Sequence, residues 1–165
     1  MEENTRVKKF SFLLLLGFIF LCQAAGILGA LFTTPAIPTW YAGLIKPTFS
    51  PPNWLFGPAW TLLYTLMGIS LYLVYQKGLK DKFVKNSFVL FLFHLVINSL
   101  WSIIFFGAKQ TGLAFIVIVL MWGLIATLIH RFRKINMVAA WLLIPYLGWV
   151  SFASVLNFAV WWLNR

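Results

Sequence analysis

Aromatic, polar and small side chains recur at helical spacing in three apolar segments of the chain. Steps of three and four residues place such side chains on one face of a helix. The three stripes are Gly57, Trp60, Tyr64 and Gly68; Phe91, His94, Asn98, Trp101 and Phe105; and Tyr146, Trp149, Ala153 and either Leu156 or Asn157. If the stripes converge, they form an apolar slot with flat walls and a few hydrogen-bonding groups, which suits a large planar apolar ligand. The same spacing is typical of ordinary helix packing, so both interpretations stay open here.

Acid–base and metal chemistry have few candidate residues in this sequence. Of its 165 residues only three are Asp or Glu, against 13 Lys or Arg. The sequence shows no hydrolytic triad, phosphate-binding loop or metal-ligand cluster, and the single cysteine, Cys22, excludes an internal disulfide. His94 could bond Asn98 four residues away, or serve as the axial ligand of a metalloporphyrin, although packing is the commoner role. We therefore expect no metal site and no conventional acid–base enzyme.

The stripes lie within long apolar segments. Hydrophobic residues make up 62% of the chain and charged residues 10%, whereas soluble domains average roughly 45–50% and about 25%. Five segments have about the 20 apolar residues that a transmembrane helix needs. They span about 10–32, 54–76, 84–106, 112–129 and 138–163. We predict a single domain, 1–165, with an all-α integral membrane fold of five transmembrane helices, the last of them bent by Pro145.

Positive charge predicts how the helices are oriented. Ten of the 13 basic residues fall in the N-terminus, the second loop and the fourth loop, while Lys46, Lys109 and Arg165 fall on the opposite side. The positive-inside rule then places the N-terminus in the cytoplasm and the C-terminus outside. These clusters are topology signals, so the net charge of +10 does not indicate nucleic-acid binding. The first segment could be a cleaved signal peptide, but its length and the lack of a small-x-small site favour a retained helix.

One connection is much longer than a simple turn. Residues 33–53, between the first two helices, contain five prolines and three aromatic residues. Proline lowers the entropy lost when such a segment becomes ordered, and it interrupts helices. Trp40 and Tyr41 could anchor the loop at the membrane interface, or the loop could be a structured lid over a cavity. The residue types alone leave both interpretations open.

The same loop carries a family signature. The stretch Trp40–Trp54, WYAGLIKPTFSPPNW, resembles the WYxxLxKPxxxPPxW motif of the TspO/MBR family, which comprises tryptophan-rich sensory proteins and mitochondrial translocator proteins. The resemblance continues through Gly57–Trp60, Asn98–Trp101 and Pro145–Trp149 and covers about residues 26–162. It implies a five-helix bundle with a structured loop between the first two helices and a cavity beneath that loop. Together with the charge bias, it implies a bacterial inner-membrane protein.

The resemblance also implies a function. We expect a membrane sensor or binding protein for protoporphyrin IX, haem-type tetrapyrroles and other planar apolar ligands. The alternatives are light-dependent degradation of protoporphyrin IX, as in some bacterial members, and transport of tetrapyrroles or sterols. Porphyrin or haem is then a ligand, and no cofactor is required. The expected partners are the lipid bilayer, the small-molecule ligand and a second copy in a homodimer, which is common in the family; nucleic acid is not expected.

The resemblance, together with Tyr64 from the first stripe, gives a set of expected site residues. The ligand-binding residues are Ala30, Trp40, Tyr41, Phe56, Gly57, Trp60, Tyr64, Asn98, Trp101, Trp149 and Ala153. If light-dependent degradation applies, Trp60 and Trp149 are the catalytic residues, since they match the tryptophans on which bacterial members rely. An indole stacked on an excited porphyrin can donate an electron, and this step needs no carboxylate.

Overall fold

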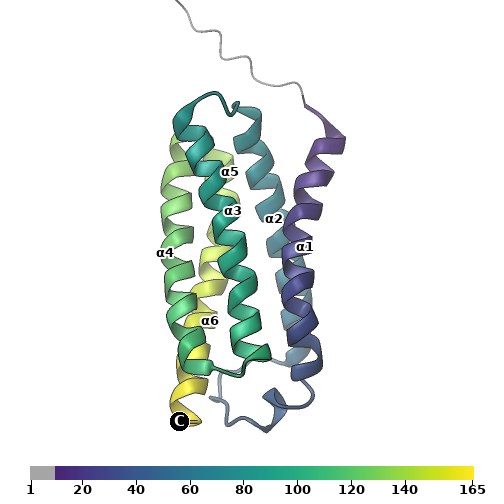
Figure 1. Ribbon diagram of the computed structural model, residues 1–165, viewed down its shortest axis with the longest axis vertical. Helices are drawn as coiled ribbons and strands as arrows, with labels where there is room; N and C mark the ends of the chain where they lie inside the picture. Colours follow the sequence, from purple (N-terminus) through teal and green to yellow (C-terminus); the bar gives the residue numbers. More distant parts are fainter. Residues whose placement is uncertain (1–9) are drawn as a thin grey trace, which may run out of the picture.

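Five helices long and apolar enough to cross a membrane form a bundle in residues 10–165, which the computed structural model describes (Figure 1). Their segments are α1 (Phe12–Ala36), α2 (Phe56–Gln76), α3 (Lys82–Ser102) with its π-helical continuation η3 (Ile103–Gly107), α4 (Thr111–Ile135), α5 (Met137–Leu142) and α6 (Ile144–Leu163). The described residues contain no β-strand, so the predicted all-α membrane fold is confirmed. Arg6, Lys8 and Lys9, which support the predicted orientation, lie outside the described residues.

Successive spans alternate in direction, so the bundle has two different ends. The α1–α2 loop, the α3–α4 connection and the C-terminus gather at one end, and the α2–α3 and α4–α5 connections lie at the other (Figure 1). Backbone packing joins α1 to α2 and α3, α4 to its neighbours α3, α5 and α6, and α2 to α5. In the part of the chain that the structure describes, no comparable packing joins α2 to α6. The α2–α6 side of the bundle is therefore held mainly by side chains.

Small residues bring α1 close to α2. A Cβ atom added at Gly68 would lie 2.5 Å from Ile19 Cα, so only glycine allows this backbone approach. Between the same helices, Gln23 Nε2 donates hydrogen bonds to Thr61 O at 2.9 Å and to Thr65 Oγ1 at 3.0 Å. The first span thus forms one wall of the bundle, although much of its surface remains exposed.

Two helices run further than the sequence predicts. α1 continues past the expected end at residue 32 to Ala36, with Pro35 in its last turn. A proline removes one backbone donor near the end of a helix, which shortens the hydrogen-bond ladder without stopping it. α4 ends at Ile135 rather than 129, because hydropathy marks the membrane boundary and not the helix end. Its cationic turn remains packed: Phe132 is fully buried and Arg131 Nε donates to Ser87 Oγ at 2.9 Å.

The last span is interrupted rather than continuous. α5 ends at Leu142 and α6 begins at Ile144, with Leu143 between them. Pro145 stands in the first turn of α6, where its missing N–H costs no helical hydrogen bond. The sequence predicts a bend from this proline, and the structure separates the span into two helices there. The break at Leu143 lies six residues before Trp149.

Fully buried apolar side chains fill the bundle interior between α2, α3, α4 and α6. They include Met67, Leu71, Phe91, Ile118, Met121, Ile125, Phe132 and Val150. Phe91 and Phe132 stack across α3 and α4 with ring centroids 5.9 Å apart. This filled region supports the helices. Near the α1–α2 loop the interior of the bundle is less completely filled.

Candidate functional site

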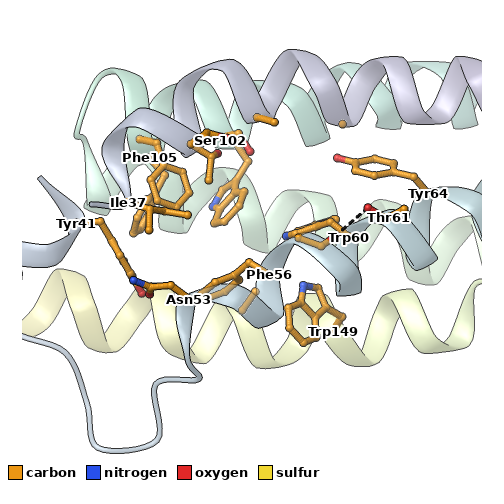
Figure 2. A pocket seen from close by; sticks show the side chains of 18 of the residues that line it. Ile37, Tyr41, Asn53, Phe56, Trp60, Thr61, Tyr64, Ser102, Phe105 and Trp149 are labelled. Carbon is orange, nitrogen blue, oxygen red and sulfur yellow. Dashed lines mark hydrogen bonds between the residues drawn. The ribbon is translucent and has the colours of Figure 1, made fainter. Parts of the chain in front are cut away.

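A cavity of about 270 Å³ opens among α1, α2, α3, η3 and α6, at the end of the bundle that the α1–α2 loop covers (Figure 2). Its lining consists of Gln23, Gly26, Ile27, Ala30, Thr33, Thr34, Ile37, Tyr41, Asn53, Phe56, Gly57, Trp60, Thr61, Tyr64, Trp101, Ser102, Phe105, Phe106, Trp149, Ala153, Leu156 and Asn157. Most of these side chains are apolar or aromatic, and the polar ones are neutral. Such a lining favours ligands that are apolar over most of their surface.

Aromatic rings form the inner walls of the cavity. Trp60 stacks on Tyr64 with centroids 5.5 Å apart and an interplanar angle of 28°, and its ring lies 6.5 Å from that of Trp101 at 35°. On the α6 side, Trp149 meets Phe56 edge-on at 6.2 Å. Gly57 adds room, because a Cβ atom there would meet nothing within 4 Å. The arrangement leaves a space bounded by several flat faces (Figure 2).

Trp101 is fixed in place by a polar partner. Its Nε1 donates to Asn157 Oδ1 at 3.0 Å, and Asn157 Nδ2 donates to Thr111 O at 2.8 Å. Asn157 therefore ties together α3, α4 and α6 and also lines the cavity. An indole held in this way offers a rigid surface to a ligand.

A buried polar network supports the cavity from behind. The Tyr64 hydroxyl donates to Asn98 Oδ1, and Asn98 Nδ2 donates to the Tyr146 hydroxyl at 2.7 Å. His94 Nε2 lies 2.8 Å from the same Tyr146 oxygen. Asn98 and His94 are buried and do not line the cavity. This network orients Tyr64, and it leaves His94 badly placed to ligate a metalloporphyrin bound in the cavity.

The α1–α2 loop is folded onto the bundle as a structured cover. It contains two short 3₁₀ turns, η1 (Tyr41–Gly43) and η2 (Asn53–Leu55). Tyr41 lines the cavity, is only 3% exposed, and its ring lies 5.7 Å from that of Phe106. Burial raises the pKa of the Tyr41 phenol above its ordinary value. Trp40 lies outside the lining and packs edge-on against Phe105 at 5.8 Å.

Two polar side chains stabilise the cover. Lys46 Nζ donates to the carbonyl oxygens of Tyr41, Ala42 and Leu44 at 2.8, 3.2 and 3.1 Å, which closes the η1 turn. Asn164, just after α6, accepts a hydrogen bond from Ile45 N at 3.0 Å and donates one to Ile45 O at 2.9 Å. These two hydrogen bonds fasten the loop to the residue that follows α6.

The structure brings most of the expected site residues together. Those that line the cavity are Ala30, Tyr41, Phe56, Gly57, Trp60, Tyr64, Trp101, Trp149 and Ala153, whereas Trp40 and Asn98 lie behind it. Sequence reasoning missed Gln23 and Asn53 as lining residues, and it named Asn157 only as an alternative to Leu156, whereas both line the cavity. A signal existed for Gln23, which is a strongly polar residue in an otherwise apolar first segment. Asn53 follows two prolines in the loop and shows no such pattern.

The match to known proteins extends over all the residues that line the cavity. The sequence pattern of the TspO/MBR family matches residues 18–163. A tryptophan-rich protein TspO from Archaeoglobus fulgidus is 47% identical over 143 residues, which is 86% of this chain and 90% of the relative. The Ovis aries translocator protein is 36% identical over 90% of this chain and 89% of its own length. A tryptophan-rich sensory protein from Cereibacter sphaeroides is 34% identical, covering 92% and 91%.

Proposed function

This chain belongs to the TspO/MBR family and is an integral membrane protein, and we propose that it binds porphyrins such as protoporphyrin IX or haem, and similar planar apolar molecules, in the cavity beneath the α1–α2 loop. The observation that carries the proposal is the set of flat faces around that space. Trp60 lies at 28° to Tyr64 and at 35° to Trp101, so a planar ligand can contact several rings at once. Ring contacts of this kind contribute about 0.5–1.5 kcal/mol each beyond the burial of apolar area.

The polar groups of the cavity suit orientation rather than catalysis. Asn53, Thr33 and Asn157 supply neutral hydrogen-bonding groups, and the lining contains no carboxylate. The cavity volume of about 270 Å³ lies just below the roughly 300–1,000 Å³ of typical ligand sites. A macrocycle would therefore need extra space, which either the loop or a wall side chain must give.

A titration in the dark tests this function. Purified protein in phosphatidylcholine nanodiscs is titrated with protoporphyrin IX while the porphyrin absorption band is followed. We expect saturable binding that Trp60→Phe weakens about two- to tenfold, the factor that corresponds to roughly 0.5–1.4 kcal/mol. Trp141→Phe is the matched control, because Trp141 is 65% exposed and does not line the cavity. Absence of saturable binding by the unaltered protein would refute the proposal.

Light-dependent degradation of the bound porphyrin is a second candidate function. The observation that favours it is the position of Trp60, which lines the cavity and has the rings of Tyr64, Trp101 and Tyr146 within 6.5 Å. An indole in contact with an excited porphyrin can donate an electron to it. Illumination of the saturated complex should then bleach the porphyrin band at a rate that Trp60→Phe or Trp149→Phe lowers. Equal bleaching in all variants would exclude this role for the two tryptophans.

We also propose that the protein lies in a bacterial inner membrane with the loop-covered end outside. The charges that support this lie in or next to the α2–α3 connection and near the α4–α5 connection, both at the end opposite the loop (Figure 1). They are Lys77, Lys80, Lys82, Lys85, Arg131, Arg133 and Lys134. Basic residues of short loops are retained in the cytoplasm during insertion.

A further inference from the structure

An apolar groove lies between α2 and α6, on the side of the bundle where backbone packing is sparse. Ala59 and Leu62 of α2 form one wall, and Gly148 and Phe152 of α6 form the other. Leu62 is 59% exposed, so the groove faces the surface that the bilayer surrounds. Among residues 10–165, Trp149 alone lines both this groove and the inner cavity. On this side of the bundle one indole therefore separates the ligand cavity from the groove.

Trp149 is held less firmly than Trp101, the tryptophan that lines the cavity from α3. Within the described residues no hydrogen bond involves Trp149 Nε1, whereas Trp101 Nε1 donates to Asn157. The ring of Trp149 contacts Phe56 at 6.2 Å and Phe152 at 5.8 Å, and both contacts are between apolar side chains. A change of side-chain rotamer at Trp149 would break no hydrogen bond. Such rotations are far faster than movements of whole segments.

The covered end of the cavity is closed more firmly than the α2–α6 side. Opening the loop requires breaking the two hydrogen bonds between Ile45 and Asn164. It also separates Tyr41 from Phe105 and Phe106, whose rings lie 6.2 and 5.7 Å away. Tyr41 is almost fully buried, so its apolar ring would then be exposed to water. Entry past the loop therefore breaks hydrogen bonds and exposes Tyr41, whereas entry between α2 and α6 requires only a rotation of the Trp149 side chain.

We propose that planar apolar ligands exchange between the cavity and the bilayer interior through the seam between α2 and α6, with Trp149 as the gate. The proposal rests on the binding function proposed above. An apolar ligand partitions into the bilayer and reaches the groove without crossing water. Movement of the Trp149 ring joins the groove to the cavity while a ligand passes, and the ring returns once the ligand is bound. The loop then stays closed during exchange.

Gly148 offers a way to block the seam without disturbing the fold. A Cβ atom at Gly148 would meet nothing within 4 Å, so a leucine there can occupy the groove from the outside. Gly148 does not line the inner cavity, so the bound state keeps its contacts. Gly123 is the matched control, since it is also exposed on a membrane-spanning helix with open space around it, but belongs to α4. Asn164→Ala tests the other route, because it removes the fastening of the loop.

The experiment compares rates of exchange with affinity. Proteins in phosphatidylcholine nanodiscs are mixed with protoporphyrin IX, association is followed by tryptophan quenching, and dissociation by dilution into excess empty vesicles. Gly148→Leu should slow both rates by about tenfold, the factor given by about 1.4 kcal/mol on the barrier, and leave Kd unchanged. Gly123→Leu and Asn164→Ala should leave both rates unchanged.

Different results would overturn the proposal in distinguishable ways. Tight binding with rates that Gly148→Leu leaves unchanged and Asn164→Ala raises would show that the ligand passes the loop. In that case the binding function stands and the seam route fails. If the unaltered protein shows no saturable binding, the proposed function fails, and the route fails with it.

Discussion

The close approach of α1 and α2 makes Gly68 the position where the smallest substitution should have a large effect. In Gly68→Ala, the new Cβ atom would lie 2.5 Å from Ile19 Cα, 2.8 Å from Ile19 N and 2.9 Å from Phe18 O. All three are backbone atoms, so no side-chain rotation can relieve the contact. Carbon atoms in van der Waals contact prefer about 3.5–4.0 Å. The backbones of α1 and α2 must therefore separate by roughly 1 Å at this point.

Two opposing terms set the size of the effect. Alanine in place of glycine within a helix gains about 0.8–1 kcal/mol. Overpacking that forces backbone shifts costs about 1–3 kcal/mol, and the separation of α1 from α2 also strains the Gln23 hydrogen bonds to Thr61 and Thr65. The expected net result is a loss of up to roughly 2 kcal/mol in the free energy of unfolding, since the steric term exceeds the propensity term.

Thermal unfolding in a mild detergent, followed by tryptophan fluorescence, measures this loss. Gly123→Ala is the control, because a Cβ atom there meets nothing within 4 Å and the propensity gain should remain uncompensated. We expect a lower Tm for Gly68→Ala and an equal or higher Tm for Gly123→Ala. If Gly68→Ala is as stable as the unaltered protein, α1 and α2 do not approach as closely as described and the reasoning is refuted.

Three further predictions concern the network, the loop and the orientation. Asn98→Ala should lower the free energy of unfolding by roughly 1–2 kcal/mol, because it removes two interhelical hydrogen bonds of about 0.6 kcal/mol each and leaves a small cavity; an unchanged Tm would contradict this. Since burial raises the pKa of Tyr41 above the ordinary value of about 10, the closed loop should be stable at neutral pH and lose stability as the pH rises above about 10. Porphyrin affinity measured from pH 8 to 11 should show this alkaline loss, and Tyr41→Phe should remove it. In intact cells, a membrane-impermeant thiol reagent should label Thr48→Cys but not Lys80→Cys, with the buried Cys22 giving little background; the reverse pattern would invert the proposed orientation.

Sequence alone predicts the spans well, because hydropathy depends on composition and not on contacts. It places the ends of α1 and α4 too early, since neither Pro35 nor the cationic turn at Arg131 breaks the backbone ladder. It also predicts one bent helix where Leu143 separates α5 from α6. Boundaries of this kind depend on local hydrogen bonds, which residue types specify only loosely.

The sequence likewise predicts only part of the candidate site. Helical periodicity correctly groups Trp60 with Tyr64, but it cannot tell whether a stripe faces a cavity or a neighbouring helix. Asn98 shares a face with Trp101, yet it lies behind Tyr64 because its amide is used by two tyrosine hydroxyls. Asn164 carries no recognisable signal, since its partner Ile45 is 119 residues away along the chain. Such long-range pairs become visible only in three dimensions.

The fastening of the loop by Asn164 has a practical consequence for handling the protein. The neighbouring residue is Arg165, whose guanidinium lies over the Trp162 ring at 3.0 Å from its centroid. A bulky group introduced next to Asn164 would crowd the contact that holds the cover shut. Conversely, a small dye attached at position 165, one residue from the partner of Ile45, would serve as an optical reporter of loop opening.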